Sequence, residues 1–188
     1  RPWKAGSGQR RNSLMADFVI RAAGEADIER LLEVERRAAA LLLGLGTHDL
    51  LAMHSLSAQD LHDGTTQGIL RVADVDGHAV GFALAGQVDG HAHLFEMDVV
   101  PGHGRRCIGT ALLESVCRHA LARGYPSMTL TTLRDVPWNA PFYARRGFVE
   151  LPEQSWGPEL CKIIEREQML GFPMQLRVVM QRRLDAQQ

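Results

Sequence analysis

Hydrophobic and polar positions follow two different periods along the chain. In the middle of the chain, three short runs alternate apolar and polar residues, and a period of two is typical of strands with one buried face. Asp76-Gly77 and Asp89-Gly90 separate these runs, and Asp-Gly between two such runs predicts a tight hairpin. The pattern therefore predicts a three-stranded antiparallel meander. Its strands are expected at residues 69–75, 79–85 and 91–100.

Other stretches repeat their apolar residues at the spacing of an amphipathic helix. A glycine follows three of them, at Gly124, Gly147 and Gly171, and glycine directly after a helix is its commonest C-terminal residue. Ser57 precedes a further short stretch and is a typical helix N-cap. Helices are therefore expected at residues 28–43, 57–62, 105–123, 139–146 and 158–170, and further strands at 17–21, 127–132, 148–151 and 176–181.

The order of these elements predicts an α/β fold. The strand at 91–100, the helix at 105–123 and the strand at 127–132 are expected to form a parallel β-α-β unit, because two parallel strands need a crossover connection. The hairpins make the rest of the sheet antiparallel. We therefore expect one mixed, largely antiparallel sheet with a central parallel β-α-β unit and helices on both faces.

A single domain, residues 15–188, accounts for this pattern, because neither an internal repeat nor a domain-splitting linker interrupts it. Residues 1–14 read RPWKAGSGQRRNSL. They are basic and polar and lack the apolar segment of a secretory signal. We interpret them as a leader or a disordered extension.

Charge and cysteine content narrow the possible partners. The chain has 21 basic and 22 acidic residues and a net charge of −1, so no overall field favours nucleic acid, a ribosomal surface or an anionic membrane. Its longest apolar run, Ala38–Leu43, is much shorter than the roughly 18–20 residues of a membrane helix. Three sparse cysteines favour a reducing, cytoplasmic location over a disulfide framework.

The histidines give no reason to expect a metal ion. Eight are present, but neither His91-x-His93 nor the pair His54 and His62 has the spacing of a known metal site. We therefore expect exposed histidines and no bound metal.

A glycine-rich turn joins the strand at 91–100 to the next helix. It begins after Pro101 and reads Gly-His-Gly-Arg-Arg-Cys-Ile-Gly over 102–109. The N-terminus of a helix presents unpaired N–H groups and a partial positive charge, which together make an anion site. Arg105 and Arg106 add positive charge. The turn therefore indicates phosphate binding, although an ordinary connection with basic side chains has the same local pattern.

This turn, with Val-x-Pro before it and Ala-Leu-Leu after it, resembles the Q/R-x-x-G-x-G/A loop with which acetyltransferases of the GNAT superfamily bind the pyrophosphate of acetyl-CoA. Gly109 matches the last glycine, while Cys107 replaces the first glycine and Gly104 replaces the Gln or Arg. A side chain at 107 is harmless in the right-handed helical region and costly at positive φ. The resemblance implies that the pyrophosphate is held by Gly104, Arg105, Arg106, Cys107, Ile108, Gly109 and Thr110.

A second segment, 136–148, resembles the Asn…Phe-Tyr-x-x-x-Gly-Phe signature of the same superfamily. Asn139 is a good N-cap for the helix that carries the aromatic pair. The resemblance implies that Asn139 contacts the pantetheine or phosphate arm, that Phe142 packs beside the cofactor, and that Tyr143 faces the thioester sulfur and protonates the departing thiolate. By helical spacing alone, without the resemblance, a core aromatic residue is the favoured interpretation of Tyr143.

Transfer of an acetyl group to an amine needs a base, because an alkylammonium with a pKa of about 10.4 is almost fully charged at neutral pH. Glu96 is the candidate, and Asp98 on the same strand face is the reserve. Both carboxylates could instead line a solvated face. In the family this strand has a bulge and diverges from the next strand, so N–H groups near Met97 or Val99 would polarise the thioester carbonyl.

The sequence thus predicts an acetyl-CoA-dependent N-acetyltransferase that moves the acetyl group directly to a primary amine of a small molecule or peptide in a ternary complex. No cysteine nucleophile is needed, although Cys107 as an acyl carrier is a minor alternative. A non-catalytic acyl-CoA-binding regulatory module is the main alternative. Residues 44–66 and 152–174 are expected to wall the acceptor site, and Arg134 and Asp135 to orient the substrate. A homodimer is possible, with the strand at 176–181 as its edge.

Overall fold

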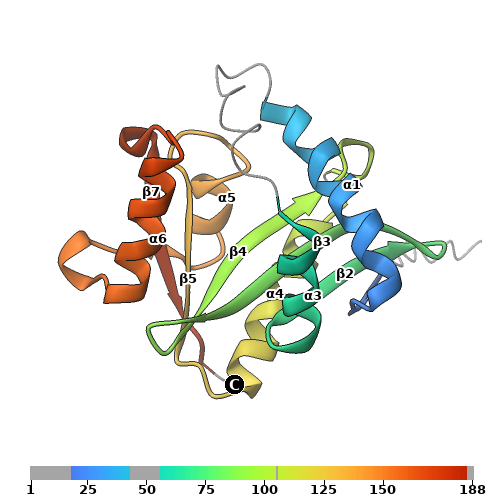
Figure 1. Ribbon diagram of the computed structural model, residues 1–188, viewed down its shortest axis with the longest axis horizontal. Helices are drawn as coiled ribbons and strands as arrows, with labels where there is room; N and C mark the ends of the chain where they lie inside the picture. The colour runs from blue at the N-terminus through green and yellow to red at the C-terminus, as the bar shows by residue number, and fades with distance from the viewer. Residues whose placement is uncertain (1–17, 43–55, 105, 186–188) are drawn as a thin grey trace, which may run out of the picture.

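The computed structural model describes residues 18–42, 56–104 and 106–185, so the predicted leader lies outside the described residues. A mixed seven-stranded sheet forms the centre (Figure 1). Its strands are β1 Val19–Ala22, β2 Ile69–Val75, β3 His78–Val88, β4 His91–Val99, β5 Ser127–Leu133, β6 Val149–Glu150 and β7 Arg177–Arg183. The α-helices are α1 Ile28–Ala39, α3 Ala58–Thr66, α4 Ile108–Ala122, α5 Ala140–Ala144 and α6 Pro158–Met169. Short 3-10 turns are η1 Glu25–Asp27, η2 Ala40–Leu42, η3 Pro101–His103, η4 Glu153–Ser155 and η5 Met174–Leu176.

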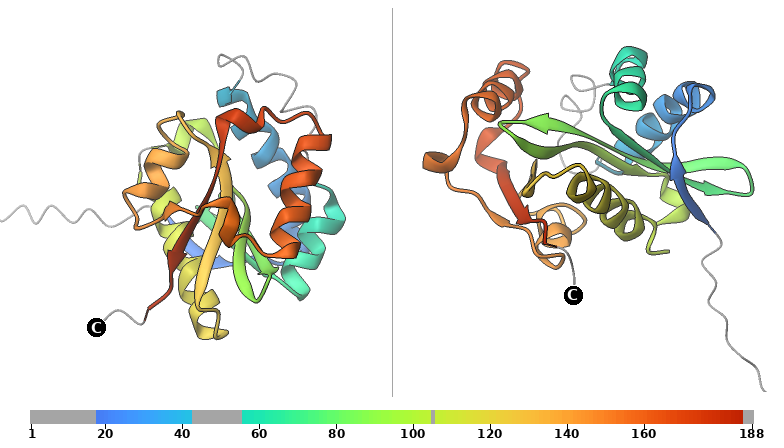
Figure 2. Two further views of the ribbon diagram at one scale, coloured as in Figure 1. Left: turned by 90° about the vertical axis from the view of Figure 1, so that its left-hand side faces the viewer. Right: turned by 90° about the horizontal axis from the view of Figure 1, so that it is seen from below.

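The strand order is β1-β2-β3-β4-β5-β7-β6. β4 and β5 pair in parallel, and the other neighbouring strands pair in antiparallel fashion. The predicted meander, the parallel β-α-β unit and the largely antiparallel sheet are therefore confirmed. Helices cover both faces of the sheet: α1, α3 and α6 lie on one face, and α4 and α5 on the other (Figure 2).

The main hydrophobic core includes the contact between α4 and the sheet. Leu112, Leu113 and Val116 of α4 are fully buried, as is Phe82 of β3. β3 is buried on both faces because α4 covers one side and α1 and α3 cover the other. A smaller cluster, formed by Val88 of β3, Leu160 of α6 and Val179 of β7, holds α6 against the sheet. Among the described helices, none is long and apolar enough to span a bilayer.

Turn and cap residues behave as their chemistry predicts. Gly124, Gly147 and Gly171 have positive φ values of 85°, 82° and 84°, which a glycine adopts without steric cost. Ser57 accepts a hydrogen bond from the amide of Asp60 at 3.1 Å and caps α3. The predicted helix ends are less accurate: α3 runs on to Thr66, and α4 begins only at Ile108, because η3 and a turn occupy the preceding residues.

The predicted edge position of the last strand is wrong. β7 lies between β5 and β6 and pairs with both. Its central residues, Val178, Val179 and Met180, are buried on consecutive positions, and an unbroken apolar run is typical of a strand covered on both faces. Among the described residues the outer strand on this side is the two-residue β6, which pairs with Met180 and Gln181, so β7 is not the edge strand.

β4 and β5 separate along their length, as Figure 1 shows. They pair only where Ala92–Leu94 faces Met128–Leu130. Beyond these residues β4 continues to Val99 and β5 to Leu133 without pairing with each other. We call the diverging parts, 96–99 of β4 and 131–133 of β5, the β4–β5 fork. The fork leaves the edge of β4 that faces β5 without a neighbouring strand among the described residues.

A β-bulge in β4 lies at the start of the fork. Leu94 is the partner of Ala85 and Glu96 is the partner of Leu84, so Phe95 is an extra residue in β4. An extra residue bends a strand and redirects its side chains. The bulge and the divergence that the family resemblance implied are therefore both present.

Candidate functional site

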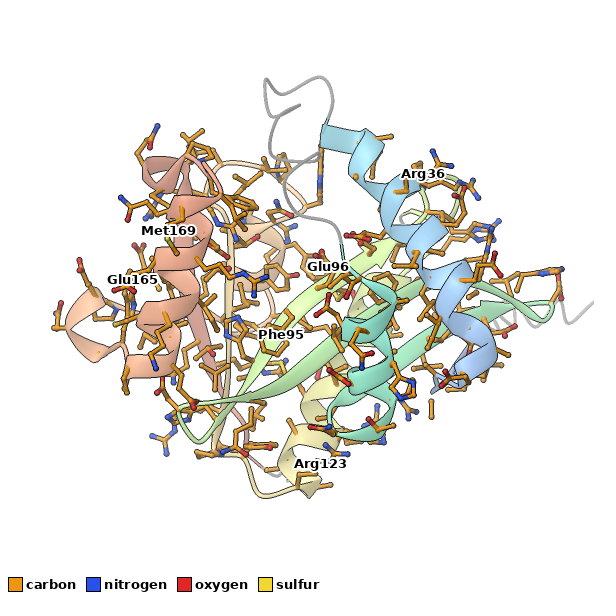
Figure 3. The ribbon with its side chains drawn as sticks, in the orientation of Figure 1. Arg36, Phe95, Glu96, Arg123, Glu165 and Met169 are labelled. Atoms are coloured by element: carbon orange, nitrogen blue, oxygen red, sulfur yellow. The ribbon has the colours of Figure 1, made fainter. Side chains whose placement is uncertain are left out.

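Glu96 and Asp98 lie on the face of β4 that α1 and α3 cover. Glu96 is opposite Leu84, whose side chain reaches Gly64 of α3. Figure 3 shows Phe95 and Glu96 above β4, between α6 on one side and α1 and α3 on the other. The bulge thus places an exposed aromatic ring beside a carboxylate on the face between these helices.

A third carboxylate, Glu35 of α1, faces this acidic pair. It is buried, and its Oε1 accepts a hydrogen bond from the amide of Leu56 at 2.9 Å. Burial, and then the negative charges of Glu96 and Glu35, raise the pKa of Asp98 well above its usual range. Asp98 therefore keeps its proton to higher pH than an ordinary carboxyl group. Glu35 was not predicted from the sequence, although its position on the apolar face of a helix, among Leu31 and other buried residues, was a visible signal.

Tyr143 of α5 is a buried aromatic residue close to the predicted carboxylates. Its ring packs in the core against Phe142 and Phe148, with centroid distances of 5.2 and 5.6 Å. Burial raises the pKa of its phenol, and the negative charges of Glu96 and Asp98 raise it further. The fold therefore brings Tyr143 within electrostatic range of both predicted carboxylates.

His93 of β4 and Thr129 of β5 form a buried polar pair where the two strands are still paired. His93 is buried, its Nδ1 lies 2.8 Å from the hydroxyl of Thr129, and its ring centroid is 4.9 Å from that of Phe95. Burial, and then the nearby charge of Arg177, lower the pKa of His93 to about 4. His93 is therefore neutral at neutral pH and serves as a packed, hydrogen-bonded residue of the sheet.

The loop before α4 has the geometry of a helix N-terminus with one unusual residue. α4 begins at Ile108, and its first turn holds no acidic residue. Cys107, at the N-cap, has φ 63° and ψ 8°, which is the left-handed region. The side chain of Ile108 is buried in the core, so only its backbone can serve a ligand. Gly104 is exposed, and Arg105 lies outside the described residues.

Two of the predicted cofactor residues on the loop, Arg106 and Gly109, lie next to different parts of the molecule. Arg106 is exposed and lines a hollow with the β2–β3 turn, where Asp74 and Asp76 lie. Phe142 of α5, in contrast, lies beside the first turn of α4: a Cβ added at Gly109 would be 3.6 Å from its ring. Two of the predicted cofactor residues, Phe142 and Gly109, are thus brought together from separate segments.

Asn139 does not cap α5 in the predicted way. Its side chain makes no capping hydrogen bond, and its backbone φ and ψ are −111° and −117°. Its carbonyl oxygen instead accepts from the amides of Phe142 and Tyr143, at 2.8 and 3.1 Å. The carbonyl of Asn139 is therefore the first hydrogen-bond acceptor of α5, because the first amides of a helix have no acceptor within the helix itself.

The predicted acceptor walls are only partly described. Residues 44–55 lie outside the described part, while α3 and α6 flank the face that carries Glu96. Arg134, expected to orient substrate, forms a two-pronged ion pair with Glu150 of β6, with both distances 2.9 Å. Asp135 beside it is exposed.

A second residue at this site, besides Glu35, was not predicted. Arg146 follows α5 and places its guanidinium 3.6 Å from the centroid of the Phe142 ring. It also donates hydrogen bonds to the hydroxyl of Thr110 in α4. The signal in the sequence was its spacing, because residues four apart share a helix face.

Comparison with known proteins agrees with this architecture. Residues 29–148 match the family model of the acetyltransferase (GNAT) family. The fold resembles that of the PaiA N-acetyltransferase from Thermoplasma acidophilum, solved with coenzyme A, at 17% identity and a TM-score of 0.67, covering 88% of this chain and 98% of that chain.

Two further structures have the same fold. The ribosomal-protein-S18-alanine N-acetyltransferase from Escherichia coli matches at 17% identity and a TM-score of 0.64, over 91% of this chain and 96% of that chain. N-acetylglutamate synthase from Neisseria gonorrhoeae, solved with coenzyme A and N-acetyl-glutamate, matches at 19% identity and a TM-score of 0.67, over 90% of this chain and 35% of that chain. The family match spans well over half of the chain, and the chain therefore belongs to the GNAT family of acetyl-CoA-dependent acyltransferases.

Proposed function

We propose that this protein transfers the acetyl group of acetyl-CoA directly to a primary amine of a small molecule or peptide, with donor and acceptor bound together. The observation that carries the proposal is the β4–β5 fork, where the edge of β4 has no neighbouring strand among the described residues. Glu96 and Asp98 of this part of β4 are within electrostatic range of Tyr143. An exposed strand edge is able to pair with an extended amide-bearing chain. The pantetheine arm is such a chain, and it ends in the thioester.

The chain's own groups fit the two ends of this cofactor. Backbone N–H groups of β4 at Met97 or Val99 are proposed to donate to the thioester carbonyl, where negative charge develops. The first turn of α4, with Gly109 and Thr110, is proposed to hold the pyrophosphate, because its N–H groups have no partners within the helix. Acetyl-CoA, once bound, supplies an activated acyl group with a thiolate as the leaving group.

Glu96 is proposed to take the proton from the attacking ammonium, directly or through water. Asp98 remains the reserve base, but its raised pKa keeps it protonated over a wider pH range and makes it the weaker candidate. Tyr143 is proposed to give its proton to the departing thiolate. Its raised pKa keeps the phenol protonated at neutral pH, so the proton is present when the thiolate forms.

Thiol release from acetyl-CoA, measured with a panel of primary amines, tests the proposal. We expect Tyr143→Phe to lower kcat about a hundredfold, the usual contribution of a general acid, and to leave the affinity for CoA unchanged. Glu96→Gln should lower kcat/KM and change its pH profile, whereas Asp98→Asn should have the smaller effect. Equal kcat values for wild type and Tyr143→Phe would remove Tyr143 from the mechanism.

The alternative is a non-catalytic acyl-CoA-binding regulatory module. It rests on Cys107, which has a positive φ and stands where the family motif has a glycine. The same experiment separates the two proposals. Binding of CoA by wild type without turnover of any amine would favour the regulatory module, and absence of CoA binding would exclude both. A cytoplasmic location is also proposed, since Cys107, Cys117 and Cys161 are all free thiols.

A further inference from the structure

The guanidinium of Arg146 is held at the first turn of α4 by residues of two helices. Its Nε donates to the hydroxyl of Thr110 at 3.1 Å, its Nη2 donates to the same oxygen, and its Nη1 donates to the carbonyl of Phe142 at 2.9 Å. The group also stacks on the Phe142 ring, a favourable cation–π geometry. Arg146 thus lies beside the helix end where the pyrophosphate is proposed to bind.

This position is electrostatically unfavourable for a cation. The N-terminus of a helix carries partial positive charge and is stabilised by anions. Burial, and then the nearby charge of Arg145, lower the pKa of Arg146, which means that its surroundings oppose its charge. The first turn of α4 has no acidic residue to offset it.

The partners of Arg146 are neutral. Among the described residues, its hydrogen bonds go to a hydroxyl and a carbonyl, and no carboxylate forms an ion pair with it. Arg177 and Arg182, which are also largely buried, are paired with Glu167 and Glu114. Three of the five N–H groups of Arg146 are used in these bonds, so two remain for an acceptor.

We propose that Arg146 binds the diphosphate of acetyl-CoA, donating its remaining N–H groups to a phosphoryl oxygen at the N-terminus of α4. This inference rests on the proposed function and adds a side chain from outside the glycine-rich loop to the cofactor site. Phe142 and Thr110 fix the guanidinium before the cofactor arrives. The nearby carboxylate Glu114 is paired with Arg182, so the anion supplies the direct ion-pair partner that Arg146 lacks among the described residues. Arginine suits this role because its planar N–H groups match phosphate geometry.

The test measures dissociation constants by calorimetry for three ligands: CoA, dephospho-CoA, which lacks the 3′-phosphate, and acetyl-pantetheine, which lacks every phosphate. Arg146→Leu should weaken binding of CoA and dephospho-CoA by at least about tenfold, as the loss of a hydrogen bond between charged groups predicts. Binding of acetyl-pantetheine should not change. The affinity of Arg146→Lys for CoA should lie between those of wild type and Arg146→Leu, because lysine keeps the charge and loses the planar group.

Arg145→Leu is the matched control, since Arg145 is the preceding residue, carries the same charge and is exposed. It should change each of the three constants less than threefold. Thermal unfolding without ligand checks that each variant is folded, and Arg146→Gln replaces Arg146→Leu if the apolar variant does not fold.

Three results would overturn the inference: unchanged affinity for CoA in Arg146→Leu, an equal loss for acetyl-pantetheine, or a loss for CoA that is absent for dephospho-CoA. The second would assign Arg146 a purely structural role, and the third would place it at the 3′-phosphate. Failure of the proposed function has a different signature: wild type would bind CoA and turn over no amine, or it would bind none of the three ligands.

Discussion

Cys107 shows how a single backbone conformation is imposed on an unfavourable residue. Its φ of 63° lies in the region that glycine adopts freely, and a glycine is what the related loop carries at this position. For a residue with a Cβ, this conformation costs about 1–2 kcal/mol. The turn from η3 into α4 requires it nevertheless, so the loop keeps its path while the residue is strained.

Replacing Cys107 with glycine should stabilise the protein. Relief of the positive-φ strain exceeds the extra backbone entropy that glycine loses on folding, which leaves a net gain of about 0.5–1 kcal/mol in the free energy of unfolding. Urea unfolding without ligand measures it. Cys107→Ala is the control, because it removes the thiol, keeps the Cβ and should show no gain. A lower unfolding midpoint for Cys107→Gly than for Cys107→Ala would contradict this account.

The buried His93 should make stability depend on pH. Its pKa is lowered to about 4 by burial in the folded protein, while a histidine in an unfolded chain titrates near 6.5. Between these values the unfolded state binds more protons, so the free energy of unfolding rises with pH. The contribution of about 3 kcal/mol is complete above about pH 6.5 and is lost as the pH falls toward 4.

His93→Gln removes the titrating group and should flatten that part of the curve of unfolding free energy against pH. His78→Gln, a change at the exposed first residue of β3, serves as the control and should keep the wild-type slope. If wild type and His93→Gln have parallel curves between pH 4 and 6.5, the assignment of the slope to His93 is wrong.

At the scale of elements, α6 is attached to the sheet by the β3–β4 turn. Oδ1 of Asp89 accepts from the amide of Glu159, and Oδ2 accepts from the amide of Leu160, both at 2.9 Å. Glu159 in return accepts a hydrogen bond from the amide of Asp89. A turn some 70 residues away thus supplies the N-terminal cap of this helix, which Gly157 permits because a Cβ there would collide with Asp89.

Asp89→Ala should destabilise the protein by about 1–2 kcal/mol. Part of the loss is the missing cap, typically about 1 kcal/mol, and part is the φ of 50° at this position, which alanine tolerates less well than aspartate. Urea unfolding measures the effect. Asp89→Asn keeps an acceptor oxygen and the tolerance of positive φ, so it should lose less than half as much. Equal midpoints for Asp89→Ala and wild type would show that α6 needs no cap.

At the scale of the whole molecule, two groups of strands meet at one short junction. β1 to β4, with α1, α3 and α4, form the larger group, and β5, β7 and β6, with α5 and α6, form the smaller one (Figure 1). Only Ala92–Leu94 and Met128–Leu130 pair across the junction. The proposed donor and acceptor sites lie where the two groups diverge, so residues from α1, β4, α4 and α5 contribute to one region.

Much of the fold followed from local chemistry. The Asp-Gly pairs, the glycines after helices and Ser57 act through their own backbone neighbours, and their predicted turns and caps are present. The position of β7 was predicted wrongly because strand order depends on which surfaces are buried, and a period of two does not encode this. For the site, the motifs singled out Phe142 and Gly109, which the fold brings together. Arg146 and Glu35 were missed because Thr110 and Leu56, to which they hydrogen-bond, are distant from them in the chain.

The sequence alone determined the types of elements, the parallel β-α-β unit and the family, because periodicity, turn residues and short motifs act over a few residues. The tertiary structure decided the divergence of β4 from β5, the raised pKa values of Asp98 and Tyr143, and the contact of Arg146 with Thr110. These properties depend on burial and on charges brought together from separate elements. Burial and long-range charge are set by packing, and packing exists only once the whole chain has folded.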